Sequence, residues 1–360
     1  MAGSRRCQDE TGSFESRLRT IRFTGHDCSQ RTQASEAFWP LACDFAPGDW
    51  VEQIERYRGC LLGLATGDAL GTPLEFSSRG SFAPVDEMMG GGPWGLQPGQ
   101  WTDDTSMALC LAECLITRRR FDPVDQLSRY LRWYREGHLS STGYCFDVGG
   151  TVRSALLRFE QTREPFCGPT DYYTAGNGSI MRLAPVPLFY ARNPLEAIEK
   201  SGESSRTTHG ATAAVDACRY FGALLVGAVN GAPKDALLSE LYSPIPGYWE
   251  ENPLAPEIYS IAIGYYTQRD ASQIRATGYV ARSLEAALWA LHSTSTFKEG
   301  CLLAVNLGDD ADTTGAVYGQ LAGAMYGERG IPQSWSKKLA QRELIESFAE
   351  QLFVLSKAPF

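Results

Sequence analysis

The sequence has few features that would direct the chain to a membrane or a nucleic acid. It contains no uninterrupted run of about 18 apolar residues, the length that crosses a bilayer as a helix, so we expect no membrane-spanning segment. Its 33 Lys and Arg residues are outnumbered by 42 Asp and Glu residues, which gives a formal net charge of -9. Because binding to phosphate backbones needs a basic surface, we expect no nucleic-acid partner, and we interpret the acidity as a contribution to solubility.

The cysteines also exclude a class of protein. There are 10 of them in 360 residues, spread along the chain without a CxxC pair. This pattern predicts reduced thiols in a cytosol, because disulfide frameworks are typical of small secreted chains. The first residues are polar up to about residue 36 and lack the apolar centre of a signal peptide. We therefore expect a cytoplasmic protein.

Strand-like alternation is nearly absent, whereas apolar residues recur at helical spacing of three and four. This spacing predicts helices over residues 51–70, 104–118, 124–137, 147–160, 195–204, 210–230, 256–268, 278–292, 297–306, 313–326 and 334–356. We predict an all-α fold on this basis. Residues 1–50 lack a sustained period and form an N-terminal extension, and residues 51–360 form one catalytic domain.

Two of the predicted helices are apolar nearly all round and rich in glycine. They contain Gly59–Asp68 and Ala316–Ala324. Glycine lowers helix propensity but lets two backbones approach closely. We expect both helices at the centre of a single core.

Two acidic clusters lie about 200 residues apart, each at the start of a predicted helix. They are Thr102–Thr105, which reads TDDT, and Asp309–Thr314, which reads DDADTT. Carboxylates with a neighbouring hydroxyl suit Mg²⁺ and Mn²⁺, which favour oxygen ligands in near-octahedral geometry. If folding brings the clusters together, they can hold two cations in one cleft. Helix capping is the simpler alternative for either cluster alone, because Thr and Asp are favoured N-caps and acids complement the helix dipole.

Three further blocks carry chemistry-bearing residues, although each also has an ordinary structural explanation. Asp68 and Glu75 bracket a predicted helix end before Pro73 and could be a solvated terminus. The loop Gly176–Arg182, which reads GNGSIMR, could present backbone N–H groups to a phosphate or could be only a turn. His209 in Arg206–Gly210 could be a cap or a hydrogen-bonded core residue.

Together these blocks resemble the ADP-ribosylglycohydrolase family, the enzymes that remove ADP-ribose from modified proteins. The matching segments are Gly59–Phe76, Trp101–Met107, Gly176–Arg182, Arg206–Gly210, Gly278–Trp289 and Asn306–Gly327. Their order and spacing are much more specific than any one of them. The resemblance covers about residues 54–340 and implies an orthogonal bundle of helices with a binuclear Mg²⁺ or Mn²⁺ site.

The resemblance also implies roles for individual residues. The metal ligands would be Thr102, Asp103, Asp104, Asp310, Asp312 and Thr313. The loop around the ADP-ribose would contribute Asn177, Gly178, Ser179, Met181 and Arg182, and His209 would lie near the phosphates. Glu75 would lie near the scissile bond. Asp309 stands where the family often has glycine, and its role is open.

The implied reaction is hydrolysis of an N-glycosidic bond through an oxocarbenium-like state. A carboxylate, Glu75 or Asp104, would orient or deprotonate the attacking water. The block that ends in Glu75 is more similar to the arginine-directed bacterial branch than to the serine-directed one. We therefore expect ADP-ribosylated arginine on a protein as the substrate. A serine-linked or small-molecule ADP-ribose is the alternative.

The N-terminal extension carries spaced aromatic residues, including Phe14 and Phe23, among arginines. The arrangement resembles hydrolases that act as immunity proteins against ADP-ribosylating toxins, in which an extension binds and blocks the toxin. A disordered tail is the simpler interpretation. Two other functions share parts of this evidence. A non-catalytic inhibitor of a transferase would not need complete metal motifs, and a two-metal phosphoesterase would not need the GNGSIMR and TTH blocks.

Overall fold

The structure, a computed structural model, describes residues 47–358, and these belong to one unit that extends over Phe45–Phe360. The predicted extension over residues 1–50 therefore lies almost wholly outside the described residues. The longer helices are α1 (Pro47–Gly71), α2 (Asp103–Arg118), α3 (Pro123–Glu136), α4 (Gly150–Thr162), α6 (Pro194–Arg206), α7 (Thr212–Val229), α11 (Val280–Ser293), α12 (Phe297–Val305), α13 (Ala311–Tyr326) and α15 (Arg342–Ser356). The shorter ones are α5 (Pro185–Phe189), α8 (Lys234–Leu237), α9 (Tyr248–Glu251), α10 (Pro256–Ala262) and α14 (Gln333–Ser336), with 3₁₀ turns η3 (Thr72–Leu74), η4 (Tyr172–Thr174), η5 (Tyr265–Gln268), η6 (Ala271–Gln273) and η7 (Glu328–Gly330).

The prediction of an all-α fold is confirmed. Residues 47–358 contain no strand, and their only β-type pairings are two isolated bridges, Gly91 with Leu96 and Gly176 with Tyr279. The second bridge matters for function, because it ties the GNGSIMR loop to the start of α11.

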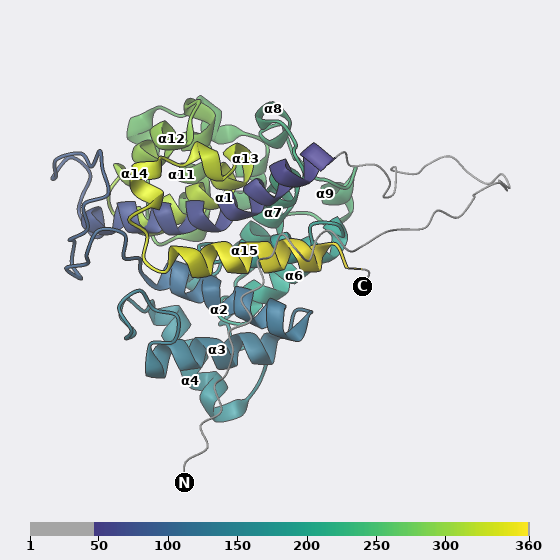
Figure 1. Cartoon of the computed structure of the whole chain (residues 1–360). Coiled ribbons are helices and arrows are strands. Elements are labelled where there is room, and N and C mark those ends of the chain that lie inside the picture. The colour runs from purple at the N-terminus through teal and green to yellow at the C-terminus, as the bar shows by residue number, and fades with distance from the viewer. Residues whose placement is uncertain (1–46, 359–360) are drawn as a thin grey trace, which may run out of the picture. The chain divides into compact units, whose positions relative to one another are not determined.

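The two glycine-rich helices, α1 and α13, pack against each other in opposite directions at the centre of the bundle (Figure 1). Their glycines meet in order along the contact, with Gly59 against Gly323, Gly63 against Gly319 and Gly67 against Gly315. A Cβ at any of these positions would collide with the carbonyl oxygen of its partner. The helices can therefore approach to backbone contact only because the side chains are absent.

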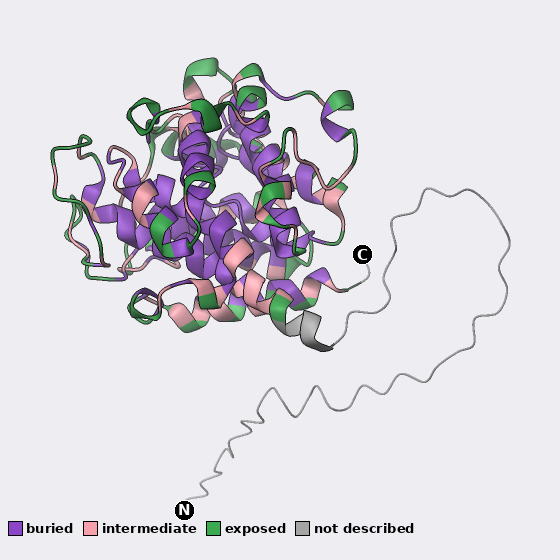
Figure 2. Ribbon diagram, turned by 90° about the horizontal axis from the view of Figure 1, so that it is seen from above, coloured by how far each residue is buried: buried purple, intermediate pink, exposed green. Residues whose placement is uncertain are grey.

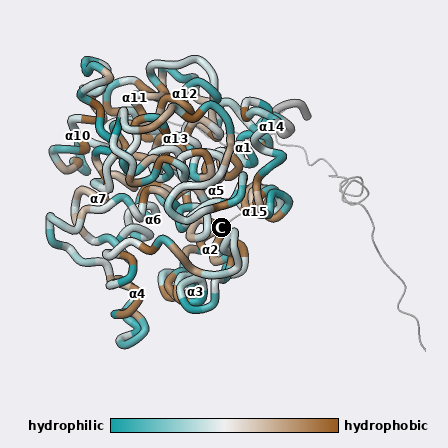
Figure 3. The backbone as a smooth tube through the Cα atoms, turned by 90° about the vertical axis from the view of Figure 1, so that its left-hand side faces the viewer, coloured by the Kyte–Doolittle hydropathy of each residue, from teal (hydrophilic) through white to brown (hydrophobic). Residues whose placement is uncertain are grey.

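The remaining helices surround this pair. Helix α13 also packs against α11 and α12, α15 packs against α1 and α2, and α2, α3 and α4 follow one another outward (Figure 1). Buried residues occupy the central helices, and exposed residues lie on the outer turns (Figure 2). Hydrophobic segments are distributed over many helices, while hydrophilic segments lie at the periphery (Figure 3). By length and composition alone α7 could cross a membrane, but 83% of this 18-residue helix is buried inside the described bundle. One such helix is weak evidence of a membrane span.

Several predicted helix bounds need correction. The segment predicted as one helix over 334–356 is two, α14 and α15, separated by residues that include Gln341 at φ 49°. The helix predicted over 256–268 ends at Ala262, because Gly264 takes φ 80° before η5. The helix predicted over 147–160 begins only at Gly150, which leaves Asp147 in a loop.

Candidate active site

The site begins where α1 ends. Helix α1 stops at Gly71 and Pro73 follows in η3, as the sequence predicts. Asp68, in the last turn of α1, is fully buried and is not a solvated terminus. One of its carboxylate oxygens accepts bonds from the Thr102 N–H (2.9 Å) and hydroxyl (3.0 Å), and the other from the Thr105 N–H (3.0 Å) and hydroxyl (2.6 Å). Asp68 therefore supplies acceptors to the free N–H groups at the start of α2.

The structure brings the two acidic clusters together. The Thr102 hydroxyl lies 3.4 Å from an Asp312 carboxylate oxygen, and the Thr313 hydroxyl lies 3.4 Å from Asp104 Oδ2. The helix N-caps are Thr102 for α2 and Asp310 for α13, and neither makes a side-chain capping bond. Capping therefore does not explain why these side chains are present.

The clusters form a buried concentration of negative charge. Burial raises the pKa of Asp103, Asp104 and Asp312 well above the usual range, and repulsion from the neighbouring carboxylates raises it further. None of the ion pairs between residues 47–358 reaches these three acids, and one oxygen each of Asp104 and Asp312 is buried without a hydrogen-bond partner. Buried carboxylates normally have a partner, and oxygen donors without one fit hard divalent cations.

Two more carboxylates join the cluster from loops. Burial, and next the nearby Asp147, raises the pKa of Glu75 to about 9, and its carboxylate accepts a 2.7 Å bond from the Trp94 indole N–H. Burial also raises the pKa of Asp147, to about 7. Carboxylate oxygens of Glu75, Asp147 and Asp312 lie within 4.8 Å of one another. Sequence reasoning missed Asp147, which it placed at a helix start. Its place beside two glycines, in a segment without apolar periodicity, is the signal that could have indicated a loop.

The GNGSIMR loop divides into residues that line the site and residues behind it. Asn177 Nδ2 donates to Asp310 Oδ2 (2.7 Å) and to Ser283 Oγ (2.8 Å), so it links the loop to the second cluster. Asn177, Gly178 and Met181 line a cavity, but Ser179 and Arg182 do not. Arg182 is fully buried and donates to the Gly178 carbonyl and to Thr208 Oγ1 (2.6 Å). Arg182 thus supports the loop from inside the protein.

The hydrogen bonds behind His209 hold its ring in place. Arg182 donates to the Thr208 hydroxyl, and this hydroxyl also bonds to His209 Nδ1, 2.9 Å away. Burial, with Arg182 as a second cause, lowers the pKa of His209 to about 3, so the ring is neutral. The opposite ring edge lies against Gly178, where a Cβ would come within 2.8 Å of His209 Cε1. His209 therefore presents the Nε2 edge of a neutral ring at the cavity wall.

These residues enclose a cavity of about 470 Å³. Of the sequence-predicted site residues, its lining includes Glu75, Asp103, Asp310, Asp312, Thr313, Asn177, Gly178, Met181 and His209. Thr102, Asp104, Ser179 and Arg182 are buried behind the wall. The Asp309 side chain is not part of the lining, and Asp309 takes φ 53°, in the left-handed region that favours glycine. This conformation gives a backbone reason for glycine at the same place in the family.

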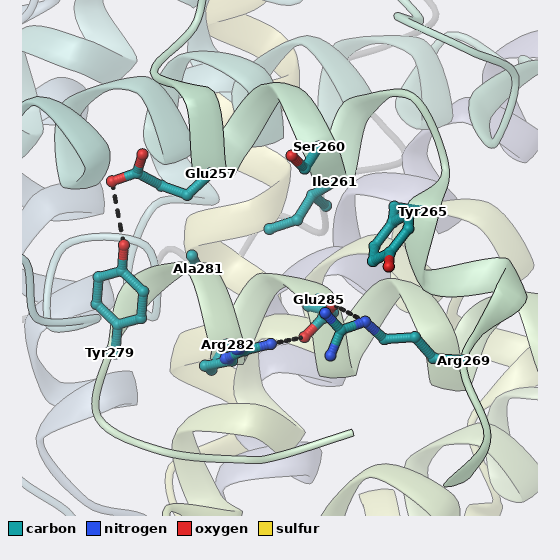
Figure 4. A pocket seen from close by; sticks show the side chains of 9 residues that line it. All are labelled: Glu257, Ser260, Ile261, Tyr265, Arg269, Tyr279, Ala281, Arg282 and Glu285. Atoms are coloured by element: carbon teal, nitrogen blue, oxygen red, sulfur yellow. Dashed lines mark hydrogen bonds and ion pairs between the residues drawn. The ribbon is translucent and has the colours of Figure 1, made fainter. Parts of the chain in front are cut away.

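A second, smaller pocket of about 220 Å³ lies between α10 and α11 (Figure 4). Its charged groups already have partners within the chain. Glu285 pairs with Arg269 (3.1 Å) and Arg282 (2.7 Å), and Glu257 accepts a bond from the Tyr279 hydroxyl (3.1 Å). Asp312, which carries an unpartnered carboxylate oxygen, lines the larger cavity, and Asp104, which carries the other, is buried behind its wall. The larger cavity is therefore the candidate active site.

Comparison with known proteins agrees with this geometry. The family model of the ADP-ribosylglycohydrolases matches residues 50–359. A protein of Serratia proteamaculans named ADP-ribosylarginine hydrolase Tri1 is 42% identical over 305 residues, covering 85% of this chain and 81% of the relative. A protein of the same name from Pseudomonas putida is also 42% identical, over 89% of this chain and 83% of the relative. The ADP-ribosyl-[dinitrogen reductase] glycohydrolase of Rhodospirillum rubrum is 31% identical over 79% of this chain and 90% of the relative.

A solved structure described as an ADP-ribosylglycohydrolase-related protein complex matches with a TM-score of 0.75 and 44% identity, over 85% of this chain and 99% of that chain. An all-helical bundle around a buried acidic cluster is thus the architecture of a glycohydrolase that removes ADP-ribose. The chain belongs to the ADP-ribosylglycohydrolase family, which confirms the resemblance read from its motifs.

Proposed function

We propose that this chain is a metal-dependent hydrolase that removes ADP-ribose from modified arginine side chains of proteins, acting in the cytoplasm. The observation that carries the proposal is the convergence of the two acidic clusters and the GNGSIMR loop on one cavity. The arginine linkage is supported by the names of the two relatives at 42% identity. The cytoplasmic location is supported by the seven described cysteines, all of which are free thiols.

The oxygen-rich donor set fits two divalent cations, Mg²⁺ or Mn²⁺. Thr102, Asp103, Asp104, Asp310, Asp312 and Thr313 would hold them. When bound, such ions supply positive charge that offsets the buried carboxylates and makes a bound water more acidic. Asn177 fixes the position of Asp310 through its 2.7 Å bond, and Asp68 fixes the start of α2.

The remaining roles follow from which atoms reach the cavity. We assign the hydrogen of the neutral His209 ring to Nε2, where it would be a donor beside the backbone of Gly178, and both groups suit the anionic part of an ADP-ribose. Glu75 lines the cavity whereas Asp104 is buried behind it, so we assign to Glu75 the role of orienting or deprotonating the attacking water. Bound cations would favour its ionised form, which this role as a base requires. In the overall step, water oxygen bonds to the ribose C1 as the bond from C1 to the guanidine nitrogen breaks, and the guanidine nitrogen gains a proton.

A protective role is part of the proposal. By reversing arginine ADP-ribosylation, the protein would give immunity to an ADP-ribosylating toxin, and residues 1–50 would bind and block the transferase. Two alternatives concern the substrate, which could be a serine-linked or a small-molecule ADP-ribose. Two others concern the function, which could be that of a mainly non-catalytic transferase inhibitor or of a two-metal phosphoesterase.

One experiment separates these functions. Peptides carrying ADP-ribose on arginine or on serine are incubated with the full chain in Mg²⁺, Mn²⁺, Zn²⁺ or EDTA, and the products are identified by mass spectrometry. We expect release of intact ADP-ribose from the arginine peptide, loss of turnover in EDTA, and better recovery with Mg²⁺ or Mn²⁺ than with Zn²⁺.

Other outcomes would reassign the function. A preference for the serine peptide would change the linkage, release of AMP would indicate a phosphoesterase, and rescue by Zn²⁺ alone would exclude the proposed ligand set. Asp103→Ala and Asp312→Ala serve as site controls. Each should abolish turnover and lower the metal content, and full metal occupancy with normal activity in either variant would refute the site.

A further inference from the structure

An aromatic row leads from the mouth of the cavity to the surface. Trp94 lines the cavity and is 37% exposed. Its ring centroid lies 5.6 Å from that of Phe146, which lies 5.9 Å from that of Tyr144, and Tyr144 is 60% exposed. Rings of this size on a cavity mouth provide flat faces for a bound group.

The loop that carries Trp94 is tied to the segment that carries Glu75. Gly91 and Leu96 pair as a β-bridge, and Gly92 takes φ 69°, where a Cβ would collide with the Thr72 carbonyl oxygen. The Trp94 indole N–H in turn donates to Glu75 (2.7 Å). Trp94 is thus held in place beside the carboxylate that we assign to the reaction.

A second aromatic residue of the cavity lining is also constrained. Phe76 lines the cavity, is 70% exposed and takes φ 62°, an uncommon conformation for a residue with a side chain. Its N–H donates to the Asp309 carbonyl (2.7 Å), and the Asp309 N–H donates to Ser77 O (2.8 Å). Backbone in this region persists where the surroundings hold it, and such positions cluster at ligand sites.

The mouth combines aromatic faces with carboxyl groups. Glu75 and Asp147 line the cavity next to Trp94 and Phe76. Elsewhere in the described chain, cations cover aromatic rings, as Arg182 covers Tyr130 at 4.7 Å and Arg269 covers Tyr265 at 5.1 Å. None of the cation–aromatic contacts between described residues involves Trp94. The face of Trp94 is therefore not occupied by a cation from residues 47–358.

We propose that Trp94, backed by Phe146 and Tyr144, is the binding site for the guanidinium group of the modified arginine and determines the preferred linkage. A guanidinium is planar and cationic, stacks on aromatic faces and donates to carboxylates in a fixed geometry. A serine-linked substrate presents no cation to this site. The inference rests on the proposed arginine-linked substrate and assigns the residues that recognise it.

The test uses the full chain with Mg²⁺ and two probes, agmatine for the guanidinium side and free ADP-ribose for the other side. In Trp94→Leu, inhibition by agmatine should weaken and KM for the arginine peptide should rise, each roughly five- to thirtyfold, while the affinity for ADP-ribose stays unchanged. Trp94→Phe keeps an aromatic face but loses the donor to Glu75. It should therefore retain most of the agmatine affinity and change kcat more than KM.

Two more variants complete the comparison. Tyr144→Leu, at the exposed end of the row, should also weaken inhibition by agmatine, but to a smaller extent. This variant replaces Trp94→Leu in the test if Trp94→Leu does not fold. Tyr265→Leu removes a 50% exposed aromatic of the second pocket and should leave all of these values unchanged.

The proposal is overturned if Trp94→Leu and Tyr144→Leu leave inhibition by agmatine unchanged. It is also overturned if they weaken the binding of agmatine and of ADP-ribose equally. A wild-type protein that does not hydrolyse the arginine peptide would instead refute the proposed function. In that case calorimetric titration of agmatine into the ADP-ribose-saturated wild type and Trp94→Leu still decides whether a guanidinium site exists.

Discussion

At the scale of single residues, Asp68 illustrates how one buried carboxylate organises the site. Its two oxygens accept four bonds from Thr102 and Thr105, which fixes the first turn of α2. Burial raises its pKa to about 6, and these bonds act in the opposite direction by favouring the ionised form. The capping function that the sequence suggests for Thr102 is thus performed from another helix. No local pattern predicts this, because the two helices meet only in the tertiary structure.

The buried acids give the first prediction. Asp312→Asn removes one negative charge from a cluster without paired cations, so in EDTA the variant should be more stable than wild type, by about 1–2 kcal/mol. Added Mg²⁺ should reverse this order, because a cation that binds only the native site stabilises wild type selectively. Urea unfolding with EDTA and with Mg²⁺ measures both effects. A variant less stable than wild type in EDTA would contradict the repulsion argument.

His209 gives a prediction on pH. Its pKa in the folded state is about 3, below the unfolded value of 6.5, so protons bind preferentially to the unfolded chain. The contribution to stability is complete above pH 6.5 and is lost as the pH falls toward 3. Between pH 7 and pH 5, protonation of this group should lower the free energy of unfolding of wild type by about 2 kcal/mol.

His209→Gln, which keeps an N–H donor but cannot titrate, should lack this part of the acid sensitivity. Chemical unfolding of both proteins at the two pH values measures the difference. Parallel pH dependence in wild type and variant would show that the ring is already protonated or exposed. The motif identified His209 as a site residue, but its neutral state depends on Arg182, which only the folded structure places behind it.

At the scale of elements, the glycine contact between α1 and α13 positions two carboxylates of the candidate site. The contact runs from Gly59 to Gly71, and its last step places Gly71 against Ala311 and Asp312. Asp68 and Asp312 are thereby brought to the same end of the pair. The approach of glycine-rich helices could be predicted from the sequence, and so could most long helices.

The errors at element scale have local causes. Helix α5 was not among the predicted helices, because it is short and contains Pro185 and Pro187. The break before α15 depends on Gln341, a residue that takes a left-handed conformation without any glycine signal. Periodicity continues across such a break, because both helices bury an apolar face in the same core.

Gly63→Ala should test the helix contact. Its Cβ would collide with backbone of Gly319, which cannot rotate away, so we expect a loss of stability of about 3 kcal/mol or more. Gly150→Ala is the matched control, since it lies in the first turn of α4 and its Cβ would meet nothing within 4 Å. The control should gain up to about 1 kcal/mol from helix propensity. Thermal and urea unfolding compare both variants with wild type. Equal stability of Gly63→Ala and wild type would show that α1 and α13 can separate freely.

At the scale of the whole chain, the described residues hold every group that the proposed reaction needs. The family model begins at residue 50, and the residues proposed as metal ligands extend from Thr102 to Thr313 within residues 47–358. The sequence motifs predicted the two-cluster site because oxygen ligands are recognisable as residue types. They could not indicate Asp147 or the aromatic row, because only the tertiary structure brings these residues to the cavity.

The last prediction concerns residues 1–50, of which all but the start of α1 lie outside the described residues. Deletion of residues 1–45 should leave hydrolysis of the arginine peptide intact, since the site lies within the retained chain. The deletion should weaken binding to an ADP-ribosyltransferase and should weaken direct inhibition of that transferase. The reason is that Phe14 and Phe23 could insert into the partner, and the arginines around them could enter a site built for an arginine substrate. The full-length double variant Phe14→Ala/Phe23→Ala is the matched control and should lose the same binding while keeping turnover. Unfolding or loss of turnover in the deleted protein would place the segment in the catalytic fold, and unchanged transferase inhibition would leave hydrolysis as the sole means of protection.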